Sequence, residues 1–226
     1  MTRQMSKGKC HLCSDTFSKA AMTGHLKSCK REKAVSNESS PGRKPRKTKT
    51  FHLIVQGRYS PDYWMHVEVP GHATLETLDG FLRRTWLECC GHMSAFTIED
   101  KTYSIAPMSE YDDASMDVRL DEILTPGMKF YHKYDFGTTT HLSLKVVSQD
   151  EGDMKAKEIQ VLARNDPPVI PCACCGKPAA QVCTECRWSG EGWLCNDCAA
   201  KHECDEDMLL PVVNSPRVGM CGYTGD

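Results

Sequence analysis

The stretch KFYHKYDFGTTTHLSLKVV, residues 129–147, decides the fold class of this 226-residue chain. Apolar and polar residues alternate in KFYHKYDF (129–136) and again in THLSLKVV (140–147), and Gly137 marks the turn between the two runs. Alternation with a period of two is typical of strands that bury one face, and two such runs joined by a short turn predict a β-hairpin. The domain around this hairpin is therefore expected to contain an antiparallel sheet.

Further elements are predicted on both sides of the hairpin. Strands are expected over FHLIVQG (51–57), YWMHVEV (63–69), AFTIED (95–100), KTYSIA (101–106) and IQVLARN (159–165). A helix is expected over 75–90, N-capped by Thr74, with Leu75, Leu78, Leu82 and Trp86 on one face, and a shorter helix over 120–124. Because strands outnumber helices and are joined by tight turns, residues 51–165 are predicted to form an α+β domain with an antiparallel sheet.

The 14 cysteines of the chain indicate how it is stabilised. No apolar segment follows the basic MTRQMSKGK (1–9), and the longest apolar runs are far shorter than the ~18 residues of a membrane span. We therefore expect a cytoplasmic protein with no membrane partner. A reducing compartment does not maintain a disulfide framework, so the thiols point to metal binding, catalysis or packing.

The first cysteine cluster predicts a zinc finger within residues 1–33. Its ligands would be Cys10, Cys13, His25 and Cys29, at the spacing of a ββα finger. The cluster resembles the two-Cys, two-His finger family, with Cys29 in place of the last His. That resemblance places Ser18, Ala21 and Gly24 at the base-reading positions. None of the three forms the bidentate pairs that discriminate bases, so sequence-specific DNA readout is not expected, and a finger that contacts protein is the alternative.

The second cluster predicts two more zinc ions in residues 166–226. An interleaved cross-brace would group Cys172, Cys175, Cys195 and Cys198 at one site and Cys183, Cys186, His202 and Cys204 at the other. A sequential arrangement like a zinc ribbon, pairing Cys172/Cys175 with Cys183/Cys186, is the alternative, and Cys174 could replace Cys172 or Cys175. Three zinc ions are thus expected in all. Cys89 and Cys90 are predicted to pack at a helix end, and Cys221 has no assigned role in an ordered, irregular tail.

Charge is distributed unevenly along the chain. Residues 1–50 carry 13 Lys and Arg against 3 Asp and Glu, whereas residues 51–165 have a net charge of −7 and residues 166–226 a net charge of −5. Residues 34–50 show no apolar periodicity and are predicted to be a basic flexible linker. A basic arm on an acidic body is expected to hold phosphates without sequence specificity. The predicted nucleic-acid-binding residues are Lys27, Lys30, Arg31, Lys33, Arg43, Lys44, Arg46, Lys47 and Lys49.

The motif YHKYDFGTTTH (131–141) resembles the signature of the plasmid pRiA4b ORF-3-like family, also labelled transposon passenger TnpR-like. The resemblance covers residues 51–165 and implies an α+β fold and an association with mobile elements. Part of the tail, including LLPVVNSPRVGMCGYTG (209–225), resembles a zinc-binding extension of some members. The sequence departs from the family in its first helix, where Gly80-Phe81-Leu82 stands in place of Asp-Leu-His.

Three functions remain open. The first is a multi-zinc adaptor in which residues 1–50 bind nucleic acid and the acidic modules bind protein. The second is a protein-binding accessory or regulatory factor of a mobile element without a nucleic-acid role. The third is a hydrolase or nuclease using Asp135, His141 and His92, with Asp135 and His141 paired across the hairpin. The competing structural interpretation is that Asp135 caps the turn after the first hairpin strand, and no activated Ser or Cys nucleophile favours an enzyme.

Overall fold

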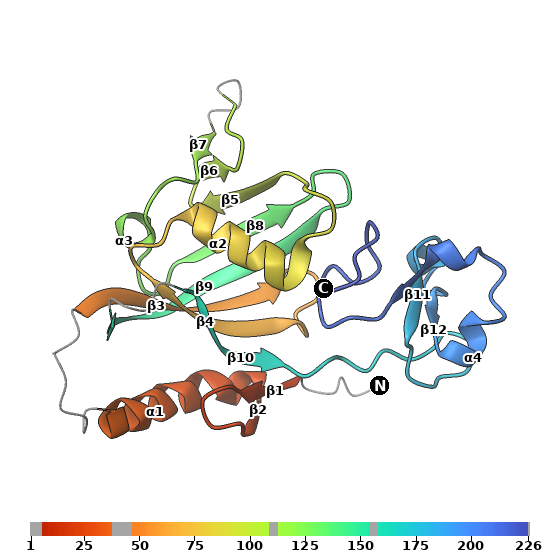
Figure 1. Ribbon diagram of the computed structural model, residues 1–226, viewed down its shortest axis with the longest axis horizontal. Coiled ribbons are helices and arrows are strands. Elements are labelled where there is room, and N and C mark those ends of the chain that lie inside the picture. Colours follow the sequence, from red (N-terminus) through yellow and green to blue (C-terminus); the bar gives the residue numbers. More distant parts are fainter. Residues whose placement is uncertain (1–5, 38–46, 109–112, 154–157, 226) are drawn as a thin grey trace.

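The computed structural model describes residues 6–37, 47–108, 113–153 and 158–225, and it has an α+β architecture built on a ten-stranded sheet (Figure 1). The strand order is β2-β1-β10-β4-β3-β9-β8-β5-β6-β7, and neighbours are antiparallel except β6 and β7. The strands are β1 Lys7–Cys10, β2 Thr16–Ser18, β3 Lys47–Gly57, β4 Trp64–Pro70, β5 Ser94–Ile98, β6 Lys101–Ser104, β7 Ala114–Ser115, β8 Lys129–Tyr134, β9 Thr140–Asp153 and β10 Gln160–Asn165. None of the helices in these ranges has the length and hydropathy to cross a bilayer.

The hairpin predicted from residues 129–147 is confirmed and lies in the middle of the sheet. β8 and β9 pair in a register that runs from Lys129 opposite Lys145 to Tyr134 opposite Thr140. Phe130 and Leu142 point to the buried face, which α2 (Leu75–Leu82) covers (Figure 1). The other face of β3, β9 and β8, opposite α2, is called the open face below. The short helix α3 (Leu120–Ile123) matches the helix expected over 120–124.

The helix expected over 75–90 ends earlier than predicted. Thr74 caps α2 as expected, because its hydroxyl accepts a hydrogen bond from the Thr77 N–H at 3.2 Å. A π-helical turn over Arg83–Leu87 follows, and Glu88 is already extended. The Glu88 carboxylate accepts a hydrogen bond from the Gly91 N–H at 2.6 Å, which turns the chain away from the helix axis. Cys89 and Cys90 therefore lie in a loop and not at a helix end.

The N-terminal finger is not a separate unit, contrary to the division predicted at residues 33 and 51. β1 and β2 with α1 (Lys19–Asn37) form the expected ββα unit, but β1 also pairs with β10 and so extends the central sheet. The expected linker is shorter than 34–50, since α1 continues to Asn37 and β3 starts at Lys47. Residues 47–50 are in a strand because they pair with residues 150–153 of β9. Residues 38–46 lie outside the described chain.

Strand β4 explains why the finger and the sheet are joined. Met65 and Val67 point into the core under α2, while Trp64 packs among Met22 and Leu26 of the finger. The Trp64 indole N–H also donates to the Ser6 hydroxyl at 2.7 Å. Both faces of β4 are thus buried, although Met65 to Val69 alternate between apolar and polar residues as in a half-exposed strand.

Replacing Gly8 by Ala should loosen this junction. A Cβ at position 8 would lie 2.3 Å from the Arg164 carbonyl oxygen and 2.6 Å from the Trp64 ring, so β1 would have to move away from β10. We expect a loss of about 1–3 kcal/mol in unfolding free energy, measured by urea titration of the metal-loaded chain. Gly24 is the matched control: its Cβ would meet open space in α1, so Gly24→Ala should stabilise by up to ~1 kcal/mol. Equal effects of the two substitutions would contradict this account.

The C-terminal module has little regular structure of its own. It contains a three-stranded sheet in the order β12-β11-β13, with β11 at Gln181–Cys183, β12 at Trp193–Leu194 and β13 at Leu209–Pro211. Helix α4 covers Asn196–Ala199, and 3₁₀ turns cover Cys186–Ser189 and Glu206–Met208. After β13 the chain runs back toward the central sheet (Figure 1). There Ser215 and Arg217 are buried, so the tail of residues 212–225 is an ordered part of the central domain.

Candidate functional site

The finger brings its four predicted ligands together. The ligand atoms of Cys10, Cys13, His25 and Cys29 all lie within 4.8 Å of one another, so this group could hold a metal ion. Cys10 lies at the end of β1 and Cys13 in the turn after it, while α1 supplies His25 and Cys29 from one face. The Phe17 ring stacks on the His25 imidazole at 3.9 Å between centroids and fixes its orientation.

The C-terminal module holds two further groups, and their grouping is the interleaved one. Cys175 Sγ lies 3.6 Å from Cys195 Sγ, and Cys186 Sγ lies 3.6 Å from Cys204 Sγ. The N–H of Cys195, with other backbone donors, lowers the pKa of the Cys172 thiol to about 6 against the opposing effect of burial. Cys174 is exposed and belongs to neither group. The two groups that could hold a metal ion are Cys172, Cys175, Cys195 and Cys198, and Cys183, Cys186, His202 and Cys204.

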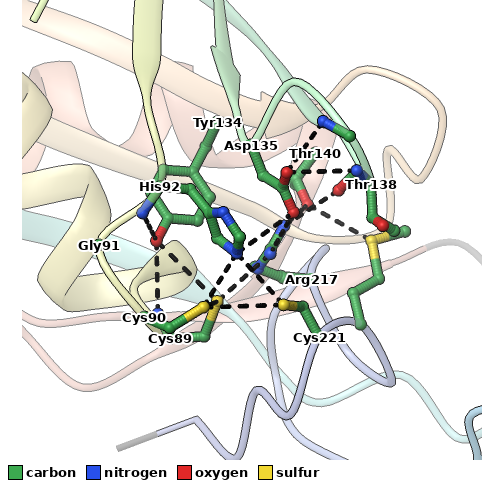
Figure 2. A network of polar contacts seen from close by, with 12 residues as sticks. Cys89, Cys90, Gly91, His92, Tyr134, Asp135, Thr138, Thr140, Arg217 and Cys221 are labelled. Carbon is green, nitrogen blue, oxygen red and sulfur yellow. Dashed lines mark hydrogen bonds and ion pairs between the residues drawn. The ribbon is translucent and has the colours of Figure 1, made fainter.

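A fourth group was missed by the sequence analysis. Cys89, Cys90 and His92 lie in the loop after α2, and Cys221 of the tail completes the group (Figure 2). All four ligand atoms lie within 4.8 Å of one another. From the sequence, Cys89 and Cys90 are expected to pack at a helix end, His92 is a catalytic candidate and Cys221 has no role. No CxxC spacing marks this group, and the available signal was that Cys89, Cys90 and Cys221 are not ligands of any predicted zinc site.

The catalytic constellation predicted from Asp135, His141 and His92 is only partly assembled. His92 Nε2 lies 3.5 Å from Asp135 Oδ2, but no contact among the described residues joins Asp135 to His141. His141 instead lies opposite Lys133 in the β8–β9 register, with its ring 5.4 Å from that of Tyr59. The pairing across the hairpin fails because Asp135 turns inward after β8, with φ of +64°.

Asp135 has the turn-capping role that was the alternative to catalysis. Its Oδ1 accepts hydrogen bonds from the N–H groups of Gly137 at 3.0 Å and Thr138 at 3.2 Å. Its Oδ2 accepts one from Arg217 Nη2 at 2.9 Å, and the Arg217 side chain is fully buried (Figure 2). Burial alone would raise the pKa of Asp135, but these hydrogen bonds hold it below its usual value. The carboxylate is therefore an ionised structural anchor for the tail.

A basic groove lies between α1 and the open face of the sheet. It has a volume of about 860 Å³, and its cationic lining residues are Lys19, Arg58, Lys129 and Lys145. Tyr131 is 39% exposed in the groove, and the Arg58 guanidinium lies over its ring at 4.4 Å. Asp62 is the acidic residue of the lining. Counting charges along the chain did not reveal this groove, because Arg58, Lys129 and Lys145 belong to a segment with a net charge of −7.

Two buried histidines, His66 in the groove lining and its neighbour His52, add no charge to this region. His52 Nε2 lies 2.8 Å from His66 Nδ1, and both rings are buried. Burial lowers the pKa of His52 to about 4 and that of His66 to about 3, so both imidazoles are neutral at pH 7. The positive potential of the groove therefore comes from its lysines and its arginine.

The predicted nucleic-acid-binding residues have different surroundings. Lys27, Arg31 and Lys49 are exposed. Lys30 is not free for a ligand, because it forms an ion pair with Glu68 and lies 3.7 Å from Asp150. The side chains of Lys33, Arg43, Lys44, Arg46 and Lys47 lie outside the described part of the chain. Part of the basic arm thus neutralises the acidic body of the same molecule.

No family model and no curated protein matches this chain. Among solved structures, the protein of unknown function MM3350 from Methanosarcina mazei Go1 is similar to it, with 16% sequence identity and a TM-score of 0.46. The similarity covers 52% of this chain and 69% of that protein. The resemblance of residues 131–141 to the plasmid pRiA4b ORF-3-like family stays a prediction.

Proposed function

We propose that this protein binds single-stranded nucleic acid without sequence specificity in the basic groove, and that zinc folds its finger and C-terminal module. The strand would lie between α1 and the open face, with its phosphates against the lysines. The proposal agrees with the nucleic-acid role expected from the charge distribution, but it places the main contact in the groove and not in residues 1–50. A protein partner for the acidic C-terminal module stays a prediction.

The observation that carries the proposal is the pair Lys129 and Lys145. The two residues lie directly opposite each other in the β8–β9 register, on the same face, and both are exposed. Like charges at directly opposed positions destabilise a sheet. Among the described residues no ion pair neutralises either lysine. A phosphate bound between the two ammonium groups would replace this repulsion by attraction. The pair therefore lowers folding stability but would favour the binding of a phosphate.

Tyr131 supports a single strand as the ligand. It lies two residues along β8 from Lys129, opposite Ser143, and is therefore on the same face of the sheet. Aromatic rings beside a cationic track stack on unpaired bases of any sequence, whereas the bases of a duplex are already stacked on one another. The side chains Ser18, Ala21 and Gly24 of the finger offer no bidentate base contact. Binding through phosphates and stacking is therefore non-specific.

Zinc is the metal that best fits the three groups predicted from the sequence. Each offers four thiolate or imidazole ligands from the protein, the donor set of closed tetrahedral zinc sites. Because no ligand position is left for water, these sites are structural and not hydrolytic. A Zn²⁺ ion with four thiolates carries a charge of −2 and one with three thiolates and a histidine carries −1. The C-terminal module would therefore repel phosphate, which leaves the groove as the nucleic-acid interface.

The double variant Lys129→Ala/Lys145→Ala tests the proposal. Each lysine contact to a phosphate of a single strand contributes about −0.7 to the slope of log affinity against log salt, so removing Lys129 and Lys145 should reduce the slope by about 1.4. We expect affinity for a labelled single-stranded oligonucleotide to fall about tenfold or more at low salt, measured by fluorescence anisotropy. Unfolding free energy should stay equal or rise by a few tenths of a kcal/mol, because the repulsion is gone.

The matched control removes two lysines elsewhere. Lys101 on β6 and Lys201 after α4 are exposed and lie outside the groove, so Lys101→Ala/Lys201→Ala should bind as the parent does. An equal loss in both double variants would indicate net charge alone and would sink the groove assignment. Equal affinity for a duplex of the same length would contradict the stacking role of Tyr131.

A further inference from the structure

We propose that Cys89, Cys90, His92 and Cys221 bind a fourth zinc ion, which fastens the C-terminal tail to the central sheet. This tail site combines one loop with one tail residue 129 positions away from His92. It is independent of the groove and of nucleic-acid binding. The proposal rests on the ligand geometry, on the backbone that holds the ligands and on the buried charges beside them.

The distances between the ligand atoms match a tetrahedral thiolate site. Zinc–sulfur bonds of about 2.3 Å at tetrahedral angles place two sulfurs about 3.8 Å apart. Cys90 Sγ lies 3.7 Å from Cys89 Sγ and 3.8 Å from Cys221 Sγ. The predicted site in the C-terminal module has the same dimensions, with 3.7 Å between Cys198 Sγ and Cys175 Sγ. These separations are far longer than the ~2.05 Å of a disulfide.

The imidazole completes the set. His92 Nε2 lies 3.0 Å from Cys90 Sγ and 3.2 Å from Cys221 Sγ, so its lone pair is directed at the same point as the sulfurs (Figure 2). In the finger, the corresponding distance from His25 Nε2 to Cys13 Sγ is 3.3 Å. The tail site therefore has the ligand set and the dimensions of the Cys₃His group of the finger.

The loop of residues 88–92 is held in shape by groups that are not ligands. The Tyr134 hydroxyl accepts hydrogen bonds from the N–H groups of Cys89 at 3.4 Å and His92 at 3.3 Å, and it donates to Glu88 Oε1 at 2.9 Å. Three of the four ligands thus lie in a loop that Tyr134, the last residue of β8, holds in place.

A buried cation lies beside the tail site. Arg217 Nη2 donates to Cys89 Sγ at 3.3 Å as well as to Asp135 Oδ2 at 2.9 Å, and the arginine is fully buried. A zinc ion with three thiolates and a histidine has a charge of −1, which the guanidinium would offset. Asp135 Oδ2 in turn lies 3.5 Å from His92 Nε2. A closed anionic metal centre accounts for a buried arginine that has two anionic partners.

Zinc at this site would fix the tail at its far end. Ser215 already anchors the near end, because its hydroxyl donates to the Trp86 carbonyl oxygen at 2.7 Å. Cys221 has a φ of +46°, a left-handed conformation that is uncommon for residues other than glycine. A ligand bond to zinc would compensate for this conformation. The C-terminal module would then be tied to the central sheet at both ends of the tail.

Zinc counting on the intact chain tests the proposal. The parent chain, purified with zinc under reducing conditions, should hold four zinc ions by native mass spectrometry. The variant Cys90→Ser/Cys221→Ser keeps only two ligands of the tail site and should hold three. Cys174→Ser is the matched control, since Cys174 is an exposed thiol outside every group, and it should hold four. Three ions in the parent, or the same number in parent and double variant, would overturn the proposal.

Alkylation of the parent chain gives a second measurement that does not depend on a variant folding. Cys90, Cys221 and Cys174 are all exposed, so without metal all three thiols should be open to iodoacetamide. We expect zinc to slow the reaction of Cys90 and Cys221 at least about tenfold relative to the chelated chain, while the rate of Cys174 should not change. Equal rates of Cys90 with and without zinc, or a Cys90–Cys221 disulfide in reducing buffer, would refute the site.

Amide exchange tests the fastening role. The N–H groups of Val218 and Met220 donate to the carbonyl oxygens of Ser215 and Arg217, at 3.1 Å in each case. In Cys90→Ser/Cys221→Ser these amides should exchange faster by about tenfold, whereas those of β3 should not change. Unchanged protection of the tail in a variant that has lost one zinc would show that the ion does not hold the tail.

Discussion

Removal of zinc should unfold the C-terminal module while the central sheet remains folded. The strands of the module have only two or three residues each, and its buried apolar side chains are few: Leu194 is buried, and Val182 belongs to the core of the central domain. Such a small core cannot offset the entropy of ordering the segment. Structural zinc supplies apparent binding free energies of about 10–16 kcal/mol, which here act as folding free energy. This is the largest effect expected for any change to the molecule.

The measurement is hydrogen exchange with a high-affinity chelator present. Amides of β11, such as Val182 paired with Leu210, should lose protection completely, and those of β3 should keep it. Cys195→Ser should reproduce the loss at constant zinc, because Cys195 is buried in the Cys₄ group, while Cys174→Ser should not. Protection of β11 that survives both chelation and Cys195→Ser would show that the module folds by packing alone.

The contrast with the finger shows what the sequence could and could not predict. The spacing of Cys10, Cys13, His25 and Cys29 located the ligands, because a CxxC turn and a helical His-x₃-Cys are local patterns. The pairing of β1 with β10 joins residues more than 150 positions apart, and no local pattern specifies it. The sequence of β4 gave no cue either, because Met65 to Val69 alternate between apolar and polar residues, a pattern that predicts burial of one face only.

The tail site could not be predicted from the sequence, for a related reason. Its ligands Cys89, Cys90 and His92 follow a helix whose end was placed at residue 90, and on a helix adjacent cysteines point in different directions. The π-helical turn and the extended Glu88 turn the loop so that both sulfurs face Cys221. Only the folded tail supplies the fourth ligand. Metal sites built from long-range contacts require the fold before they can be recognised.

The fold also changes how the uneven charge distribution of the sequence is interpreted. The net charge of +10 in residues 1–50 suggested an arm free to bind polyanions. In the structure Lys30 is neutralised by Glu68, so the acidic body and the basic arm attract each other. Lys27, Arg31 and Lys49 remain exposed, and two further exposed cations, Lys129 and Lys145, oppose each other on the open face. The position of each charged side chain in the fold is therefore a better guide to a polyanion-binding surface than the net charge of a sequence segment.

Arg217→Met should be the most damaging single substitution that leaves every zinc ligand in place. The side chain is fully buried and donates to Asp135, Cys89, Thr140 and the Thr138 carbonyl oxygen. Its loss would leave the Asp135 carboxylate buried without its cation. Breaking a buried pair in this way costs about 3–5 kcal/mol, which for a chain of this size lowers Tm by about 10 °C. Thermal unfolding of the zinc-loaded chain measures it.

Three further variants show whether that loss comes from the buried charge of Arg217. Arg119 also forms an ion pair, with Asp121 at 2.7 Å, but it is half exposed, so Arg119→Met should cost less than about 1 kcal/mol. Asp135→Asn keeps a side chain that tolerates the positive φ and removes the other charge. In Arg217→Met/Asp135→Asn the carboxylate no longer lies buried without its cation, so the double variant should be destabilised by clearly less than the sum of the single effects. Additive losses would show that Arg217 acts through packing alone and not through its charge.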